Sequence, residues 1–177
     1  MRLFIAITFN DEVKEKISHI IEALRMRSTK GNFTLVDNLH LTLVFLGQLD
    51  ESKIRVVEQG LNRIDLPPFI MVLENLGKFH RPGGDIYWIG VEGNHDLTQL
   101  YGKIVSLLQD RGFTIENRPY QPHVTLGRKV LLNNYENTIE PIQVKADKIC
   151  LMESKQVNGK LTYIEVYHKV LHESKNE

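Results

Sequence analysis

The sequence of 177 residues contains a single cysteine, Cys150. One cysteine cannot form an internal disulfide, and one chain cannot build a multi-cysteine zinc or iron–sulfur site from it. Its neighbours Ile149 and Leu151 are apolar, so we expect Cys150 to be a buried, unreactive thiol. This scarcity of cysteine favours a cytoplasmic location, where thiols stay reduced.

The sequence also lacks an excess of charge of either sign. It contains 22 Lys and Arg against 22 Asp and Glu, whereas a protein that coats nucleic acid needs a surplus of basic side chains. The apolar run at residues 3–9 is too short to span a membrane, so we expect no membrane association. No P-loop and no G-x-G-x-x-G pattern is present, which leaves nucleoside triphosphatases and dinucleotide enzymes without support.

Strand-like and helix-like segments interleave along the chain. Runs rich in β-branched and aromatic residues predict strands at residues 2–9, 40–46, 69–76, 86–91, 123–129, 142–152 and 161–170. Apolar residues at helical spacing predict three helices, which begin after Asn10, Asp50 and Asn94. We expect the first helical segment to end at Gly31. Asn158-Gly159 between the last two strands predicts a hairpin, so the pattern favours an α+β fold with mainly antiparallel sheets.

Two tetrapeptides of one pattern, His40-Leu41-Thr42-Leu43 and His123-Val124-Thr125-Leu126, are separated by 83 residues. The same offset, without a gap, aligns the apolar faces of the first and third helices and places residues 3–5 on residues 86–88. Each half therefore has the order strand, helix and His-x-Thr strand. Two copies of such a unit indicate two related lobes.

We therefore expect a single bilobal domain over residues 1–177. Its pseudo-repeats would span roughly residues 1–84 and 85–177, and the C-terminal strands could be exchanged between the lobes. The two His-x-Thr segments would then face each other across a pseudo-two-fold axis.

Paired histidines and threonines on two strands suit acid–base chemistry on a phosphate. Residues i and i+2 of a strand share a face, so His40 lies beside Thr42 and His123 beside Thr125. One imidazole can act as general base and the other as general acid near neutral pH, while the hydroxyls donate to phosphate oxygens. Two histidines fall short of the three or four ligands of a zinc site, so we expect no metal. The pattern leaves open which histidine is the acid.

The extended motifs resemble the 2H phosphoesterase superfamily. The similarity is to its bacterial and archaeal branch of RNA 2′,3′-cyclic phosphodiesterases, also called 2′-5′ RNA ligases. It is carried by residues 2–7, by residues 40–47 with their Phe-Leu-Gly extension, and by residues 122–128 with a leading Pro and a final Arg. The resemblance implies a bilobal pseudo-two-fold fold with two mainly antiparallel sheets, outer helices and a cleft between the lobes.

The resemblance also implies an activity and roles for individual residues. The activity is metal- and cofactor-independent hydrolysis of RNA 2′,3′-cyclic phosphate ends to 2′-phosphomonoesters, with 2′-5′ RNA ligation as a side activity. His40 would be the general acid that protonates the ribose 3′ oxygen, and His123 the general base that activates water. Thr42 and Thr125 would hold the phosphate.

Phe45 and Arg128, each five positions after its histidine, are implied as contacts to the terminal nucleotide. Phe45 would stack and Arg128 would supply a positive charge. In a regular strand this odd spacing points to the opposite face, so a bulge would be needed to turn both toward the site. A core position for Phe45 and an ordinary surface charge for Arg128 are the alternatives.

Other functions stay open on the sequence alone. The enzyme could act on small cyclic nucleotides or on ADP-ribose cyclic phosphate, or the chain could be a non-catalytic module that binds an RNA end or a nucleotide. We expect RNA 3′ ends or cyclic nucleotides as partners and a monomeric protein. Because net charge is zero, we expect weak affinity for long RNA and recognition of its end alone.

Overall fold

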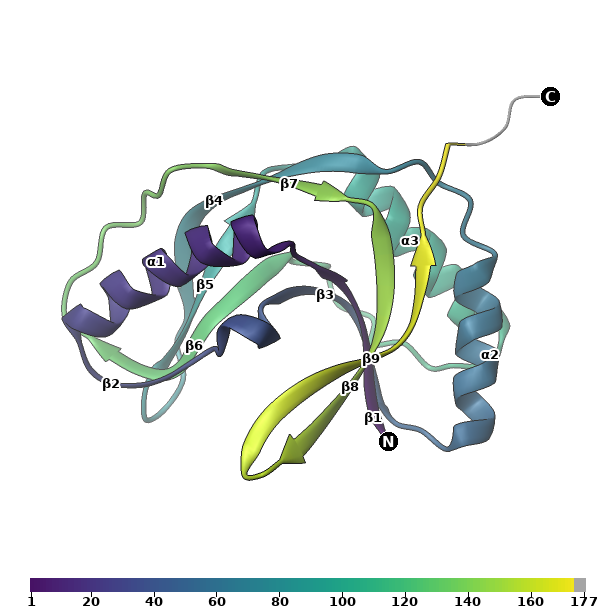
Figure 1. Ribbon diagram of the computed structural model, residues 1–177, viewed down its shortest axis with the longest axis horizontal. Helices are drawn as coiled ribbons and strands as arrows, with labels where there is room; N and C mark the ends of the chain where they lie inside the picture. Colours follow the sequence, from purple (N-terminus) through teal and green to yellow (C-terminus); the bar gives the residue numbers. More distant parts are fainter. Residues whose placement is uncertain (174–177) are drawn as a thin grey trace.

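The computed structural model describes residues 1–173, in which nine strands form two sheets (Figure 1). Sheet A contains, in spatial order, β3 (His40–Gln48), β1 (Arg2–Thr8), β8 (Lys148–Val157) and β9 (Lys160–Val170). Sheet B contains β2 (Ser28–Phe33), β6 (His123–Leu132), β5 (Asp85–Val91), β4 (Phe69–Phe79) and β7 (Ile142–Ala146). All neighbouring strands pair antiparallel. The predicted α+β class with antiparallel sheets is confirmed.

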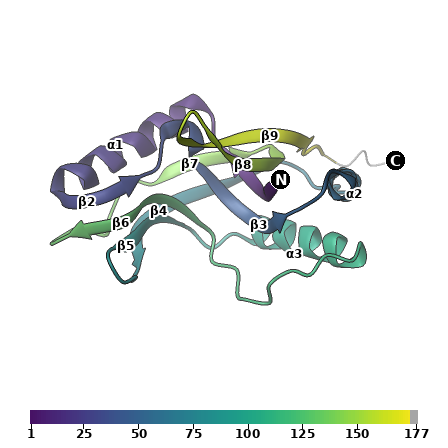
Figure 2. The same cartoon turned by 90° about the horizontal axis from the view of Figure 1, so that it is seen from below.

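The helices link the two sheets. α1 (Asp11–Arg27) follows β1 of sheet A but packs on β2, β6 and β7 of sheet B. α2 (Glu51–Asn62) and α3 (His95–Asp110) pack on each other and on sheet A, although α3 follows β5 of sheet B. Figure 2 shows α1 and α3 on opposite sides of the strands. Each sheet is therefore covered by a helix whose preceding strand lies in the other sheet.

Local capping explains where two of the helices begin. The Asn10 side chain accepts a hydrogen bond from Val13 N, and the Asn94 side chain accepts one from Leu97 N, both at 2.9 Å. These bonds satisfy main-chain donors that a first helical turn leaves free. Asp50 occupies the N-cap position of α2 without such a side-chain bond. All three predicted helix starts are confirmed.

Two predicted boundaries are wrong. α1 ends at Arg27 rather than at Gly31, and Ser28–Phe33 forms the unpredicted strand β2, which pairs with β6. The predicted strand at 142–152 is two strands, β7 and β8, which lie in different sheets. Asp147 separates them. Pairing with strands distant in sequence produced both differences, and hydrophobic periodicity carries no information about pairing.

The predicted hairpin and the repeat offset have different outcomes. Asn158 and Gly159 have positive φ angles of 50° and 77°, as a type I′ turn requires, so the hairpin is confirmed.

The offset of 83 does not hold for the first strands. Ile7 pairs with Leu41 and Ile89 pairs with Val124, which relates β1 to β5 by 82 residues. The ungapped alignment was wrong there by one position.

One large apolar core extends through both sheets and the faces of the helices that cover them. A smaller buried cluster, formed by Phe4, Ala6, Cys150 and Met152, lies on the opposite face of sheet A. Cys150 is fully buried, and burial raises the pKa of its thiol to about 12, in agreement with an unreactive thiol.

The sequence halves do not coincide with the sheets. β4 precedes residue 84 but belongs to sheet B, while β8 and β9 follow it and belong to sheet A. The fold therefore brings residues from both halves into each sheet, and the two His-x-Thr strands lie in different sheets.

Within residues 1–173, none of the helices combines the length and apolar character that crossing a bilayer requires.

Candidate active site

The two His-x-Thr segments open β3 and β6, which contact each other across the two sheets. Leu41 and Val124 are fully buried in the core. Because side chains alternate along a strand, His40 and His123 lie on the faces turned away from the core, each followed by its threonine. Both histidines are half-buried there.

A bulge in β3 changes the phase of the strand immediately after the first motif. Thr42 pairs with Ala6 and Val44 pairs with Ile5, so Leu43 is an extra residue without a partner on β1. An extra residue of this kind turns the following side chains to the other face.

An equivalent bulge occurs in β6. Thr125 pairs with Trp88 while Gly127 pairs with Tyr87, which leaves Leu126, 83 residues after Leu43, as the extra residue. The two bulges return Phe45 and Arg128 to the face that carries the histidines. Phe45 is 69% exposed, so the alternative that it is a core aromatic is wrong. Arg128 is exposed as well.

Each histidine ring is held by the main-chain oxygen two residues before it. Nδ1 of His40 lies 2.7 Å from Asn38 O, and Nδ1 of His123 lies 2.7 Å from Gln121 O. A carbonyl oxygen only accepts, so Nδ1 carries the hydrogen and Nε2 of the neutral ring is the proton acceptor. Each neutral imidazole therefore presents Nε2 as a base.

The two motifs differ in what Nε2 contacts. The Thr42 hydroxyl donates to Nε2 of neutral His40 at 2.8 Å. Within residues 1–173, Nε2 of His123 and the hydroxyl of Thr125 have no hydrogen-bond partner. The second motif therefore presents a free base and a free donor, while the first has its base and donor bonded to each other.

Aromatic rings enclose both imidazoles in similar ways. Tyr163 meets His40 edge-on, with ring centroids 5.1 Å apart and an interplanar angle of 88°. Phe79 meets His123 at 5.3 Å and 88°. Phe4 and Trp88 provide a second ring at 4.9 Å from His40 and 6.0 Å from His123, respectively. The sequence analysis missed these four aromatics, because they lie on strands other than β3 and β6.

Burial lowers the pKa of His40 below its ordinary value of 6.5, and the positive charge of Arg128, together with that of His123 when His123 is protonated, lowers it further. The hydrogen bond to the Asn38 carbonyl opposes this decrease. At neutral pH His40 is therefore uncharged in the ligand-free protein. His40 therefore interacts electrostatically with two other predicted residues, His123 and Arg128.

A cavity of about 400 Å³ opens beside this cluster. Its wall includes Thr42, Phe45, Phe79, Arg81, Tyr101, Arg118, Tyr120 and His123. Pockets of roughly 300–1,000 Å³ hold small ligands. Three predicted residues thus share a ligand-sized cavity, whereas His40, Thr125 and Arg128 lie outside its wall.

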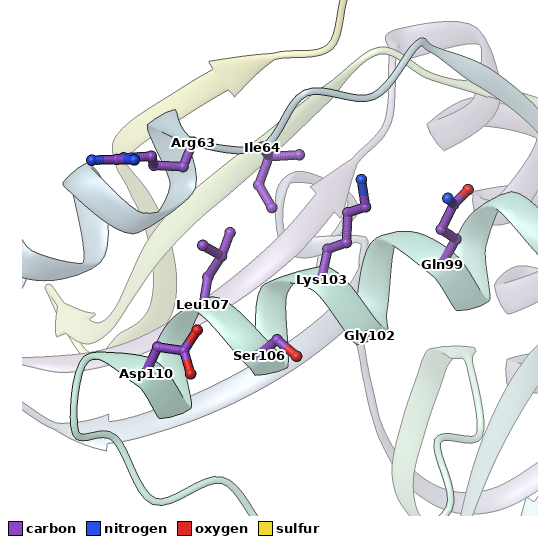
Figure 3. A pocket seen from close by; sticks show the side chains of 8 residues that line it. All are labelled: Arg63, Ile64, Gln99, Gly102, Lys103, Ser106, Leu107 and Asp110. Carbon is purple, nitrogen blue, oxygen red and sulfur yellow. The ribbon is translucent and has the colours of Figure 1, made fainter.

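A larger cavity of about 540 Å³ lies between α2 and α3. Figure 3 shows its lining, which is Arg63, Ile64, Gln99, Gly102, Lys103, Ser106, Leu107 and Asp110. These residues come from α3 and from the segment that follows α2, and none of them is a predicted site residue. In residues 1–173, no cluster of three or more His, Cys, Asp or Glu could hold a metal ion.

Known proteins are similar to this chain in fold and in sequence. Residues 13–158 match the family described as the 2′-5′ RNA ligase superfamily. An RNA 2′,3′-cyclic phosphodiesterase of Thermotoga maritima is 35% identical, and the similarity covers 100% of this chain and 96% of that protein. A crystal structure of a phosphoesterase is 28% identical with a TM-score of 0.85, over 97% of this chain and 98% of that one. Escherichia coli LigT complexed with 3′-AMP is 28% identical with a TM-score of 0.83, over 96% and 97% of the chains.

Proposed function

The chain belongs to the 2′-5′ RNA ligase superfamily, and on this premise we propose that it is an RNA 2′,3′-cyclic phosphodiesterase that forms 2′-phosphomonoesters. The Thermotoga maritima relative of that name supports the activity over the full chain length. The observation that carries the proposal is the pair of histidines, each with Nδ1 anchored on a carbonyl oxygen at 2.7 Å, so that Nε2 is the proton-accepting atom of each neutral ring. Paired imidazoles of this kind suit general acid–base catalysis.

The proposed reaction divides proton transfer between the two histidines. Nε2 of His123 removes a proton from a water molecule, whose oxygen attacks the phosphorus of the cyclic phosphate. The bond from phosphorus to the ribose 3′ oxygen breaks, and protonated His40 gives its Nε2 proton to that oxygen. The products are a 2′-phosphomonoester and a free 3′-hydroxyl. Thr42 and Thr125 donate to the non-bridging oxygens.

The environment of His40 suits an acid that is charged only when substrate is bound. In the ligand-free protein, burial and nearby positive charge lower the pKa of His40, so its ring is neutral. An anionic phosphate beside the ring favours the imidazolium and raises the pKa again. Protonation of Nε2 also ends its acceptance of the Thr42 hydroxyl, which frees that hydroxyl for the phosphate.

The proposed substrate contact is limited to the end of the RNA. The formal net charge is zero, which argues against a long footprint on the phosphate backbone. The exposed ring of Phe45 lines the cavity beside His123 and can stack on a base. Arg128, close enough to lower the pKa of His40, supplies positive charge near the phosphate. The 3′-AMP bound to the E. coli LigT neighbour favours mononucleotides as additional substrates.

One assay tests the proposal directly. An oligonucleotide ending in a 2′,3′-cyclic phosphate is incubated with the protein in excess EDTA, and the product is identified as a 2′- or a 3′-phosphate. We expect a 2′-phosphate at an undiminished rate. Recovery of the cyclic phosphate unchanged in a tight complex would instead favour a non-catalytic binding module, and loss of activity in EDTA would contradict a metal-independent reaction.

Matched substrates separate the remaining alternatives. Free 2′,3′-cyclic AMP and ADP-ribose cyclic phosphate, tested at the same concentrations, report whether the protein prefers an RNA end or a small molecule. Adding an oligonucleotide with a 5′-hydroxyl reports 2′-5′ ligation. We propose a monomer acting in the cytoplasm, which light scattering and cell fractionation can check.

A further inference from the structure

We infer that Asn38 is a positioning residue for His40 and couples the edge of sheet A to the imidazole. Asn38 is the last residue of the short 3-10 helix η1 (Val36–Asn38) and is separated from β3 by Leu39 alone. It is 7% exposed, so its polar side chain is buried. The inference rests on the proposed function, in which His40 transfers the proton to the leaving oxygen.

The Asn38 carboxamide completes the edge of sheet A. β9 is the last strand of this sheet, so one side of it has no strand partner. The Asn38 Nδ2 group donates to Leu161 O at 2.8 Å, and its Oδ1 accepts from Tyr163 N at 3.2 Å. A carboxamide offers one donor and one acceptor to these groups, as the peptide group of a further strand would.

The main chain of Asn38 continues this connection to the catalytic ring. Its carbonyl oxygen accepts the Nδ1 hydrogen of His40 at 2.7 Å. Hydrogen bonds therefore run from β9 through Asn38 to the imidazole, and they set both the ring orientation and the tautomer. Because β3 and β9 are the opposite edges of sheet A, this connection holds the sheet curled around His40.

Asn38 also places the ring that covers His40. Tyr163 N donates its hydrogen bond to Asn38 Oδ1. The ring of the same Tyr163 meets His40 edge-on, with ring centroids 5.1 Å apart. Phe4 packs against both rings, at 4.9 Å from His40 and 5.0 Å from Tyr163. One side chain thus controls a hydrogen bond to His40 and the position of an aromatic wall beside it.

The second motif has no counterpart to this arrangement. Its equivalent residue, Gln121, also accepts from its histidine through the main-chain oxygen at 2.7 Å. However, Gln121 is exposed, and its side chain forms no hydrogen bond within the described part of the chain. Substitutions at Asn38 should therefore perturb His40 and leave His123 unaffected.

The test combines kinetics with NMR of the histidine rings. Asn38→Ala removes both side-chain bonds to β9, whereas Asn38→Asp retains an acceptor for Tyr163 N and loses the donor to Leu161 O. With the cyclic-phosphate oligonucleotide, we expect Asn38→Ala to lower kcat at least about tenfold and to change KM by less than about twofold. We expect Asn38→Asp to lower kcat as well, because its carboxylate sets a second acceptor against Leu161 O.

Nitrogen-15 spectra of the imidazoles provide a readout that general destabilisation would not move selectively. We expect both Asn38 variants to shift the titration curve of His40 and its Nδ1–H signal, with the His123 signals unchanged. Gln121→Ala serves as the control variant and should leave the His40 signals unchanged. Urea unfolding of each variant establishes that the folded protein is being compared.

Several results would overturn the inference. These are a folded Asn38→Ala protein with wild-type kcat and wild-type His40 signals, or equal shifts of the His40 and His123 signals. If neither variant folds, the spectrum of the wild-type protein tests the inference. A His40 tautomer with its hydrogen on Nε2 would contradict the hydrogen bond from Nδ1 to Asn38 O. If the wild-type protein cleaves no cyclic phosphate, the proposed function fails, while the NMR result still tests the positioning of His40.

Discussion

The Tyr120 hydroxyl donates a hydrogen bond to the main-chain oxygen of Thr42 at 3.0 Å. Tyr120 lies three residues before His123, so this bond joins the approach to the second motif directly to the first motif. The ring of Tyr120 stacks on Tyr101 of α3, with centroids 4.1 Å apart and an interplanar angle of 5°. Burial raises the pKa of the Tyr120 phenol, so its hydroxyl remains a donor across the physiological range.

The variant Tyr120→Phe should weaken the connection between the motifs. It retains the stacked ring and removes one hydrogen bond, which costs about 1 kcal/mol in the free energy of unfolding. Urea denaturation and kcat/KM would both be measured, and both should decrease. Tyr101→Phe is the matched control, because its hydroxyl has no hydrogen-bond partner in residues 1–173. An equal loss of stability in the two variants would contradict the role of the Tyr120 bond.

The variants His40→Ala and His123→Ala should each lower the rate of cyclic phosphate hydrolysis by a factor of about 10²–10⁴, the usual contribution of an acid or base. The double variant should be only slightly slower than the slower single variant, since groups that act together are not additive. Single-turnover assays with the cyclic-phosphate oligonucleotide measure these rates. Full activity in either single variant would exclude the proposed mechanism.

The stability of the protein should depend on pH through His40. Burial lowers the pKa of His40 below 6.5 in the folded protein, so between the folded and unfolded values the unfolded chain binds more protons. The free energy of unfolding should therefore rise with pH up to about 6.5. As the pH falls below 6.5, the contribution of neutral His40 to this free energy is lost.

A neutral substitution isolates the His40 contribution. His40→Gln should reduce the difference in unfolding free energy between about pH 5 and about pH 7.5, measured by urea denaturation. Glu165 also has a lowered pKa in the folded protein and destabilises it at acidic pH, but it is unchanged in the variant. An identical pH dependence in the two proteins would show that His40 does not contribute.

Gly77 in β4 makes room for the indole of Trp88, a ring that lies beside His123. A Cβ atom at Gly77 would lie 2.2 Å from that ring, so Gly77→Ala must displace Trp88 and should cost about 1–3 kcal/mol by overpacking. Hydrolysis should slow as well, because the ring centroids of Trp88 and His123 are 6.0 Å apart and a displaced indole changes the surroundings of His123. Gly93→Ala, where an added Cβ meets nothing within 4 Å, is the control. Equal stability of the two variants would refute the steric argument.

Phe45→Ala should impair substrate binding more than folding. Its ring is 69% exposed, so the change in unfolding free energy should stay within about 0.5 kcal/mol. Base stacking on an aromatic ring contributes about 1–3 kcal/mol, so KM for the cyclic-phosphate oligonucleotide should rise roughly five- to 150-fold. Met26→Ala, at an 86% exposed position of α1, is the control. An unchanged KM would show that Phe45 does not contribute to substrate binding.

Features specified by neighbouring residues were predictable. The caps at Asn10 and Asn94 act within three residues, and the Asn158-Gly159 turn adopts the positive φ angles that its residues favour. β2 and the division at Asp147 were not predictable, since each depends on pairing with strands far along the chain.

The candidate site divides in the same way. The His-x-Thr pattern alone placed each histidine beside its threonine on one strand face. The bulges at Leu43 and Leu126, which turn Phe45 and Arg128 back to that face, appear only in the pairing register.

The sequence by itself determined two equivalent His-x-Thr strands, the helices that precede them and a balance of positive and negative charge. Only the tertiary structure decided that His40 is half-buried, is anchored through Asn38 to β9 and has a lowered pKa. The residue equivalent to Asn38 beside His123, Gln121, is exposed. The two motifs are nearly identical in residues, so their difference arises from what packs around each. Short-range hydrogen bonding and side-chain alternation are encoded within a few residues, but burial and pKa depend on contacts between distant segments.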